Sequence, residues 1–525
     1  MVEDIKNSLK KASKRKELAK NLGLTVLSSS LSVASFPNWS FWYLAWIALL
    51  PLLYVITKQP SAKKAFLFGL LFGASFFYGT CYWITHSPIH YGGFSPMSAY
   101  TIALIPAFTL GAFPGFFAAI QTLLLRKYGD WSLLAAPLVW AGSEFLRFHL
   151  TGIGWNCFGY SQAFQTAIVW PSKFGGVYLI SALLVLLPAA VLITLKKRNS
   201  PQIATVVVAL LLCLTVYLAG KESTVSAEAT PSSNAISAVA VQAVAPVGGE
   251  SFQKLRESFK RYKDITRENV AKLKSQKPVL VIWPETPFNF DYELDTLLRL
   301  DFEAFVRENN INLMFNVSTE TNTGSRNSVI LINNQGERLG KYDKIHLMPF
   351  GEYVPMRKYL PFDIPVLAGD FQPGTDYSVM KLENLVLGAS ICWEAAFPDV
   401  TRQQSLAGAN VLVNVADDAW FGNTPEPRQH LAHIVLRTVE TGLPMYRVTN
   451  SGITARIRPN GQVLDETALF QNAWRIWQIE ASSAKPTFYV QYGDIFAILS
   501  LLFTTVFLVL PKSIFAKRRK DARRA

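Results

Sequence analysis

The sequence has little charge and few cysteines for its length. Only 17% of its 525 residues are charged, whereas 50% are hydrophobic. This composition, together with a mean hydropathy of +0.21, is typical of membrane proteins. The four cysteines have no metal-binding spacing, and three of them lie in or beside apolar segments, so a disulfide framework is not indicated. They are Cys81, Cys157, Cys213 and Cys392.

The formal net charge of +14 is unevenly distributed along the chain. Residues 1–219 and 512–525 hold 24 of the Lys and Arg residues and only 6 of the Asp and Glu residues, whereas residues 220–511 hold 27 and 31. The basic excess therefore accompanies the apolar segments. Because no basic and aromatic constellation is present, we predict no nucleic acid partner.

Long apolar segments are abundant. A membrane-spanning helix needs about 20 apolar residues, and candidates lie near residues 22–38, 40–57, 65–85, 98–125, 131–148, 174–195, 202–219 and 490–511. The first is short and is interrupted by Ser28–Ser30 and Pro37. The pattern predicts an integral membrane α-helical bundle of about eight spans.

Lysine and arginine are strongly biased to one side of these segments. The two terminal tails and the three loops on their side hold 22 of them, whereas the opposite short loops hold only Arg147 and Lys173. The positive-inside rule then places both termini in the cytoplasm and residues 220–489 outside the membrane. In a cell with two membranes, this predicts an inner membrane protein with a periplasmic domain.

The spans divide the chain into parts. We expect a disordered basic cytoplasmic tail at 1–20, a seven-helix membrane domain at 21–219, a polar linker at 220–235, a folded domain at 236–488, a final transmembrane helix at 489–511 and a basic cytoplasmic tail at 512–525. Strands are expected at 237–244, 279–283, 312–317, 385–391, 410–415, 447–458 and 463–480, a hairpin at 327–342, and helices at 251–275, 294–309, 399–408 and 427–441. This alternation favours a layered α/β domain.

A thiol ends one of the predicted buried strands, in the stretch LVLGASICWEAAFP (385–398). Strand ends in α/β folds present reactive side chains, and Cys392 is the only cysteine outside the apolar segments. A buried free cysteine is also a common structural residue. This stretch alone supports both interpretations.

Two further stretches carry polar side chains that a nucleophilic thiol needs. In VLVIWPETP (279–287), Glu285 follows a buried strand and is a candidate general base. In GKYDKIHLMPFGEYVP (340–355), Lys344 is a candidate cation for the charge that develops on a reacting carbonyl. Taken singly, Glu285 also fits a helix-start carboxylate, and Lys344 also fits a solvated surface charge.

Together, the three stretches resemble the nitrilase superfamily, whose site is Glu, Lys and Cys in that chain order. The words WPE, K-x-H-L-x-P-F-G-E and C-W-E carry this resemblance. With the membrane segments included, nearly the whole chain is similar to the apolipoprotein N-acyltransferase family. The resemblance implies an α-β-β-α sandwich, with Glu285 as base, Lys344 as the cation that stabilises the oxyanion, and Cys392 as nucleophile.

The resemblance also implies supporting residues around these three. Glu352 would hold or relay to Lys344, Glu394 would fix the nearby loop, and Trp393 would lie beside the nucleophile. Each of the two carboxylates also fits a simple turn cap. Because the residue after a nucleophile usually offers its backbone N–H to the oxyanion, we expect this role for the N–H of Trp393. The similarity extends to Asn316, Asn327 and the runs NVADDAWFG (414–422) and RVTNSGITA (447–455). One departure is Asp417, where the family wording has Asn.

The reaction that the resemblance implies has two steps. A phospholipid donor, similar to phosphatidylethanolamine, gives its acyl chain to the thiol as a thioester, and the α-amine of a diacylglyceryl-modified N-terminal cysteine of an apolipoprotein then takes it as an amide. No cofactor or metal is implied. The alternatives are a membrane-tethered amidase or nitrile hydrolase with water as acceptor, and a catalytically silent lipid-binding or transport protein. The intact Glu285, Lys344 and Cys392 set argues against a silent protein.

Loops on the side opposite the basic residues are rich in glycine, aromatic residues and histidine. Residues 86–96 and 151–162 fit an ordinary interfacial aromatic belt, with a lipid entrance to the folded domain as the alternative. Glu144 and Arg147, one helical turn apart, fit an intramembrane pair, with a role in packing alone as the alternative.

Two segments of the folded domain are unusually apolar for loops. Residues 286–292 and 354–374 are rich in phenylalanine, leucine and proline. Exposed apolar loops usually mark an interaction surface. We hypothesise that they are mobile lids that lie against the membrane and gate acyl-chain entry.

The histidines of the folded domain have ordinary explanations. His346 is expected to be a hydrogen-bonded structural residue rather than a base. His430 and His433 are spaced i, i+3 on a predicted helix, which superficially suits a metal. Because no third ligand is in view, we predict no metal site.

Overall fold

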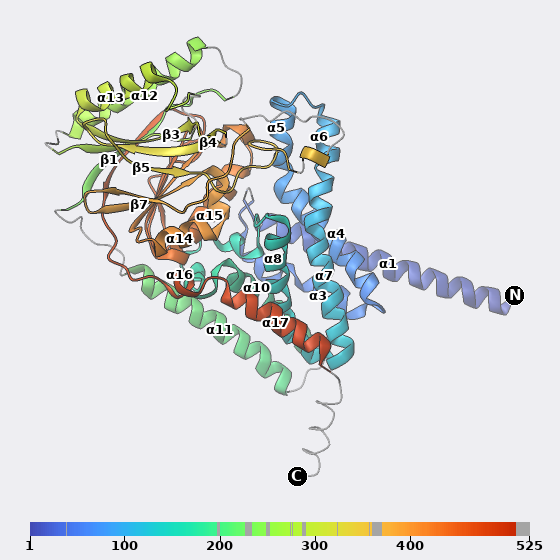
Figure 1. Ribbon diagram of the computed structural model, residues 1–525. Coiled ribbons are helices and arrows are strands. Elements are labelled where there is room, and N and C mark those ends of the chain that lie inside the picture. The colour runs from blue at the N-terminus through green and yellow to red at the C-terminus, as the bar shows by residue number, and fades with distance from the viewer. Residues whose placement is uncertain are drawn as a thin grey trace.

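The computed structural model describes residues 1–37, 39–196, 200–225, 234–247, 252–273, 275, 277–285, 290–322, 324–355, 357–359 and 370–510. They form a helical bundle joined to an α/β sandwich (Figure 1). Most of the two hypothesised lids and the C-terminal tail lie outside the described residues. So does 226–233 of the expected linker, whereas its first residues continue a helix up to Val225.

The bundle consists mainly of long apolar helices. Those long and apolar enough to cross a membrane, within the described residues, are Ala62–His90, Pro96–Tyr128, Ser172–Lys196 and Ile203–Lys221, and shorter apolar helices cover Trp42–Lys58 and Ile495–Val509. The membrane helical class is therefore confirmed, and the count of eight spans stays a prediction. The helices are α1 (Val2–Ala34), α2 (Ala45–Ala48), α3 (Leu50–Lys58), α4 (Ala62–Cys81), α5 (His86–His90), α6 (Pro96–Ile102), α7 (Leu104–Tyr128), α8 (Ala136–Thr151), α9 (Thr166–Val169), α10 (Ser172–Lys196), α11 (Ser200–Val225), α16 (Phe488–Tyr492) and α17 (Ile495–Val509).

The first helix corrects one expectation. Residues 1–20 are not a disordered tail, because they form the first part of α1, which extends away from the bundle in Figure 1. The serines that seemed to interrupt the first span do not break the helix either. Ser28 Oγ donates to the carbonyl of Ala48 in a neighbouring helix, and Ser32 Oγ, one turn further along α1, donates to the carbonyl of Ser28 at 2.9 Å.

The folded domain contains two six-stranded sheets. The first has the order β12-β1-β2-β3-β4-β5 and the second the order β11-β10-β9-β8-β7-β6. The strands of the first are β1 (Ile236–Gln242), β2 (Val279–Ile282), β3 (Ile311–Thr319), β4 (Arg326–Ile332), β5 (Arg338–Asp343) and β12 (Ala473–Ile479). Those of the second are β6 (Val379–Leu382), β7 (Leu385–Ile391), β8 (Val411–Ala416), β9 (Met445–Thr449), β10 (Ala455–Ile457) and β11 (Val463–Leu464). The strand expected at 447–458 divides into β9 and β10, which pair antiparallel. The strand expected at 463–480 divides into β11 and β12, which belong to different sheets, and the sequence does not predict β6.

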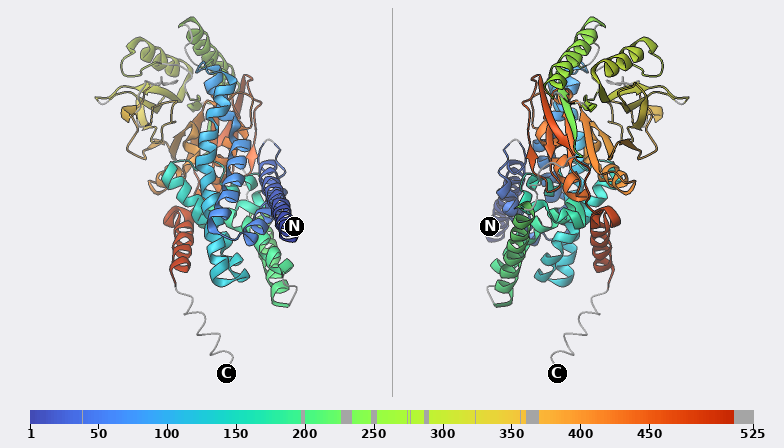
Figure 2. Two further views of the ribbon diagram at one scale, coloured as in Figure 1. Left: turned by 90° about the vertical axis from the view of Figure 1, so that its right-hand side faces the viewer. Right: turned by 90° about the vertical axis from the view of Figure 1, so that its left-hand side faces the viewer.

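Helices cover both outer faces, which confirms the α-β-β-α sandwich. α12 (Phe252–Leu273) and α13 (Thr296–Asn309) lie on the first sheet, and α14 (Pro398–Leu406) and α15 (Glu426–Thr441) on the second (Figures 1 and 2). The central strands are buried on both faces, which explains the uninterrupted apolar run of β2. Leu280 and Met314 of one sheet meet Leu387 and Val413 of the other in a single core.

The helix α15 separates the second sheet from the bundle. Every residue of this helix except Arg428 is buried. Leu431, Val435 and Val439 belong to the same apolar core as Trp140 of α8 and Val177 of α10. The α/β sandwich is therefore packed directly onto the membrane helices.

Candidate active site

Three of the predicted site residues follow strands. Glu285 lies three residues after β2, Lys344 comes directly after β5, and Cys392 directly after β7. β2 and β5 run in the same direction, because β2 and β3 are parallel and the two antiparallel pairings of β4 restore the direction at β5. Glu285 and Lys344 thus lie at one edge of the first sheet.

Lys344 is the centre of the polar site. Its ammonium Nζ lies 3.2 Å from Glu285 Oε1 and 2.9 Å from Glu352 Oε2, and all three side chains are buried. Burial acts to lower the pKa of Lys344, but the two carboxylates outweigh burial and raise it. Lys344 is therefore a fixed cation between two carboxylates.

Asn327 and a backbone amide orient the two carboxylates. Asn327 Nδ2 donates to Glu285 Oε1 at 3.2 Å and to Glu352 Oε1 at 2.7 Å. The backbone N–H of Asp417 donates to Glu285 Oε2 at 3.1 Å, so both oxygens of this carboxylate are held. The sequence marked Asn327 only through the family similarity, and its bridging position could not be inferred from spacing.

Cys392 is buried and has a left-handed backbone, with φ of 53°. This conformation costs a residue other than glycine about 1–2 kcal/mol. Burial raises the pKa of the Cys392 thiol well above its ordinary value, and the charge of Glu285 raises it further, while the charge of Lys344 lowers it. The thiol is therefore protonated at neutral pH and needs a base.

Glu394 connects the turn after β7 to the segment that follows β5, where Lys344 lies. Its Oε1 accepts hydrogen bonds from the Tyr342 hydroxyl at 2.9 Å and from the backbone N–H of Ile345 at 2.7 Å, and its Oε2 accepts one from the N–H of Ile391 at 2.8 Å. Trp393 Nε1 donates to the carbonyl of His346 at 2.6 Å, which adds a second link. Glu394 and Trp393, which follow Cys392 directly, are thus hydrogen-bonded to the residues that follow Lys344.

Comparisons with known proteins match both halves of this architecture. Residues 28–191 match the family described as apolipoprotein N-acyltransferase N-terminal domain, and residues 244–487 match carbon-nitrogen hydrolase. The apolipoprotein N-acyltransferase of Geobacter metallireducens is 31% identical over 495 residues, which cover 90% of this chain and 92% of that protein. The chain belongs to the apolipoprotein N-acyltransferase family.

Another member of the apolipoprotein N-acyltransferase family, from Nitrosomonas europaea, is 29% identical over 512 residues, which cover 94% of this chain and 98% of that protein. A solved structure of an amidase from Nesterenkonia sp. AN1 is similar with a TM-score of 0.38 and 17% identity, covering 51% of this chain and 97% of that one. The family resemblance carried by the sequence motifs is confirmed by the matches to family members.

Asp417, the departure from the wording of the apolipoprotein N-acyltransferase family, lies in the site. Its carboxylate accepts hydrogen bonds from the N–H of Ala419 at 3.0 Å and from Asn450 Nδ2 at 2.9 Å. Burial raises the pKa of Asp417 to about 7, and the charges of Glu285 and Asp418 act in the same direction. This side chain therefore titrates near neutral pH beside the predicted base.

A second polar cluster contacts the turn Cys392–Ala396, which follows β7 and carries the predicted nucleophile (the nucleophile turn). Asp418 accepts two hydrogen bonds from Arg447, at 2.8 and 2.9 Å, and lies 3.0 Å from His430 Nδ1. Burial acts to raise the pKa of Asp418, but the Arg447 and His430 charges outweigh it and lower the pKa to about 2. Potential metal-ligand atoms lie within 4.8 Å of one another in Asp418, Glu426 and His430. The carboxylate of Asp418 is already paired with the Arg447 cation.

The two histidines spaced i, i+3 do not converge. The His433 ring packs against Trp155 at 4.4 Å and Tyr160 at 3.9 Å between ring centroids, whereas His430 faces Asp418. His346 is hydrogen-bonded, as expected, with its Nε2 2.7 Å from an oxygen of Asp399. The histidines of the i, i+3 pair thus have different surroundings, a distinction that the spacing does not reveal.

The loops opposite the basic residues contact the catalytic domain. Trp155 is buried and its Nε1 donates to Gln429 Oε1 at 3.0 Å, and Ser87 Oγ donates to the carbonyl of Trp420 at 2.6 Å. An interfacial belt in contact with lipid is therefore wrong for Trp155, because the sandwich covers it. The 86–96 segment lies against 417–422, which also contacts Glu285.

In α8, the structure favours the packing role of Glu144 and Arg147 over a direct ion pair. Glu144 accepts hydrogen bonds from Trp140 Nε1 at 2.9 Å and from the N–H of Phe158 at 2.7 Å, and Arg147 donates to the carbonyl of Trp155 at 2.8 Å. No salt bridge joins Glu144 and Arg147 within the part of the chain that the structure describes. Both side chains instead hold the loop after α8, because its backbone groups need buried partners.

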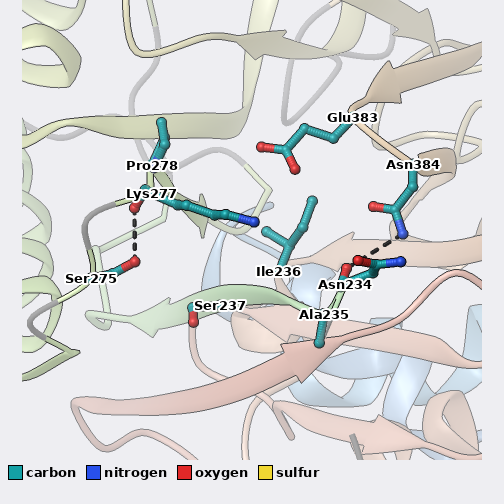
Figure 3. A pocket seen from close by; sticks show the side chains of 9 residues that line it. All are labelled: Asn234, Ala235, Ile236, Ser237, Ser275, Lys277, Pro278, Glu383 and Asn384. Carbon is teal, nitrogen blue, oxygen red and sulfur yellow. Dashed lines mark hydrogen bonds between the residues drawn. The ribbon is translucent and has the colours of Figure 1, made fainter. Parts of the chain in front are cut away.

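A cavity of about 200 Å³ lies elsewhere on the sandwich (Figure 3). It opens at the start of β1 and β2 and at the β6–β7 turn, whereas Glu285 and Cys392 follow the ends of β2 and β7. Its lining residues are Asn234, Ala235, Ile236, Ser237, Ser275, Lys277, Pro278, Glu383 and Asn384. The cavity is thus at the opposite strand ends from the predicted site.

Proposed function

We propose that the protein transfers an acyl chain from a phospholipid, through a thioester on Cys392, to the α-amine of the N-terminal diacylglyceryl-cysteine of lipoproteins. The observation that carries this proposal is the buried Lys344 held between Glu285 and Glu352, with the charges of Glu285 and Lys344 acting on the Cys392 thiol. Membership of the acyltransferase family supports the same reaction.

In the first step, the Cys392 sulfur attacks the ester carbonyl as its proton passes to Glu285. A free thiolate is disfavoured here, because Glu285 and Glu352 already outnumber the single Lys344 charge. The oxyanion that forms is stabilised by the Lys344 ammonium and the backbone N–H of Trp393. Its collapse leaves the thioester, and the departing lysophospholipid oxygen takes the proton from Glu285.

In the second step, the lipoprotein amine attacks the thioester carbonyl. The amine must be neutral to attack, and Glu285 takes the proton that it loses on forming the amide. The Cys392 sulfur leaves and regains its proton from Glu285. This two-step scheme predicts ping-pong kinetics with a covalent acyl-enzyme.

The catalytic domain is placed in the periplasm in this proposal, with both termini in the cytoplasm of an inner membrane protein. The bias of lysine and arginine supports this orientation. In cells with a permeabilised outer membrane, an impermeant maleimide should label Ser95→Cys and not Lys63→Cys. The reverse pattern would exclude the orientation.

Intact-protein mass spectrometry tests the reaction. Purified protein is incubated with phosphatidylethanolamine alone, in the wild type and in Cys392→Ala. We expect a hydroxylamine-sensitive mass increase of one acyl chain in the wild type only, and its discharge when a diacylglyceryl peptide is added. An intact donor with no adduct on the wild type would refute the proposed function.

A further inference from the structure

The first turns of α15 face two parts of the molecule at once. Gln429 has five hydrogen bonds to segments of the bundle: its Oε1 accepts from Trp83, Trp155 and Asn156, and its Nε2 donates to the carbonyls of Pro37 and Thr80, all between 2.9 and 3.2 Å. All the hydrogen-bonding groups of this buried amide are thus used by membrane segments. The next residue, His430, reaches the nucleophile turn instead.

His430 contacts the backbone of the nucleophile itself. Its Nε2 lies 2.9 Å from the carbonyl oxygen of Cys392, and because a carbonyl only accepts, Nε2 carries the proton and donates. Asn414 Nδ2 donates to the same oxygen at 3.3 Å. The other ring nitrogen is held by Asp418 and Glu426, at 3.0 and 3.2 Å, so the ring cannot rotate freely.

The hydrogen bond from His430 to the carbonyl of Cys392 holds a strained part of the backbone. Cys392 has a positive φ, which side chains other than glycine avoid, so outside contacts must hold its peptide in place. Holding the carbonyl of Cys392 restrains the direction of its Cα–Cβ bond, and this direction limits the positions that its sulfur can reach. Attack on an ester needs this direction to be right, because an error of about 1 Å can cost a hundredfold in rate.

We propose that His430 is a positioning residue for acylation of Cys392, and that Gln429 makes this positioning depend on the membrane helices. The inference rests on the proposed function and extends it. The membrane bundle is then part of the catalytic geometry as well as the anchor of the domain.

Three variants test the role of His430. His430→Gln keeps an amide donor near the Nε2 position, whereas His430→Phe fills the volume without a donor. His433→Phe is the matched control, since His433 is equally buried on the same helix and its ring nitrogens have no hydrogen-bond partner among the described residues. The measured quantities are the rate of acyl-enzyme formation from phosphatidylethanolamine and the melting temperature in detergent.

We expect His430→Phe to slow acylation about 10- to 100-fold, His430→Gln to stay within about 5-fold of the wild type, and His433→Phe within about 2-fold. Rescue by the glutamine separates a donor role from a merely structural one, because both variants disturb the pairing with Asp418. Acylation by His430→Phe at the wild-type rate would overturn the proposal. So would equal slowing of the phenylalanine and glutamine variants.

A double-mutant cycle tests the link to the membrane. Gln429→Met has a similar length and removes the amide, so we expect it to slow acylation as well. If both residues act through the Cys392 carbonyl, Gln429→Met with His430→Phe will be no slower than His430→Phe alone. Multiplying effects would show independent actions and overturn the coupling.

An activated ester separates this inference from the proposed function. The burst of p-nitrophenol from p-nitrophenyl acetate reports Cys392 acylation without a phospholipid. If the wild type gave this burst but no phospholipid adduct, the proposed function would fail, and the order of the His430 variants in the burst would still decide the positioning role. An unchanged burst rate in His430→Phe would overturn it.

Discussion

The Lys344 ammonium lies 3.2 Å from the Glu285 carboxylate, and both side chains are almost completely buried. In this environment neither charge is screened by water, so each strongly affects the other and the nearby thiol. In the proposed reaction, Lys344 is therefore a fixed cation for the oxyanion, and the Cys392 thiol stays protonated until it reacts.

Lys344→Met should abolish acyl-enzyme formation and destabilise the protein by about 3–5 kcal/mol, because two buried carboxylates lose their cation. Lys344→Met with Glu352→Gln should recover much of the stability, since one uncompensated charge is removed, but no activity. Thermal melting in detergent and intact mass measure the two effects. Wild-type acylation in Lys344→Met would contradict the assigned role.

The two carboxylates beside Lys344 should differ in their effect on the rate. Glu285→Gln removes the proposed base and should slow acylation at least about 100-fold, within the usual range for a general base. Glu352→Gln should cost less, about 10-fold, because Glu352 supports Lys344 and accepts the N–H of Met348 at 2.7 Å. Single-turnover acylation rates decide the order, and a larger loss in Glu352→Gln would reverse the assignment.

The thiol should react slowly with alkylating reagents at neutral pH. Burial and the charge of Glu285 raise the pKa of Cys392, so the rate of carboxamidomethylation by iodoacetamide should rise about tenfold per pH unit up to pH 9 without a plateau. Glu285→Gln should speed the reaction at a given pH. Cys392→Ser gives the background from the other cysteines, and a plateau below pH 8 would show an ordinary or lowered pKa.

Asp417→Asn should stabilise the protein more at pH 8 than at pH 5. The pKa of Asp417 is raised to about 7, so the folded state holds this proton more tightly than the unfolded state, and wild-type stability falls as pH rises toward 7. The amide of Asp417→Asn does not titrate, so the stability of this variant does not fall for this reason as pH rises. The advantage should grow by roughly 2–3 kcal/mol between the two pH values in denaturation measurements. A difference that does not depend on pH would contradict the shift.

Buried apolar runs bounded by turns were readily predicted from the sequence. β7 has the predicted bounds, and α15 begins one residue before its predicted start. The sequence does not predict the strand β6, because its four residues contain an exposed lysine, Lys381, and the strand is stabilised by its pairing with β7. The sequence does not predict that α1 begins at Val2, because the basic composition of its first residues resembles that of a solvated tail.

The motifs predict which residues belong to the candidate site, but they do not predict the hydrogen bonds that connect these residues to the rest of the protein. Glu285, Lys344 and Glu352 carry short recognisable words, and the structure brings them into contact. The bond between Trp155 and Gln429 joins residues 274 positions apart. The sequence marks the loop 151–162 as rich in glycine and aromatic residues, but no local pattern marks Gln429 as its partner. Only the packing of the sandwich on the bundle creates such contacts.

The pairing of β1 with β12 has a consequence for biosynthesis. Ile236 is opposite Ile479 in this antiparallel pair, so the first sheet needs strands from both ends of its domain. Ribosomal synthesis delivers β12 long after β1, because the other strands of both sheets lie between them in the chain. Contacts this distant in sequence close slowly. The growing chain must therefore remain incompletely folded, with β1 lacking this partner, until β12 has been made.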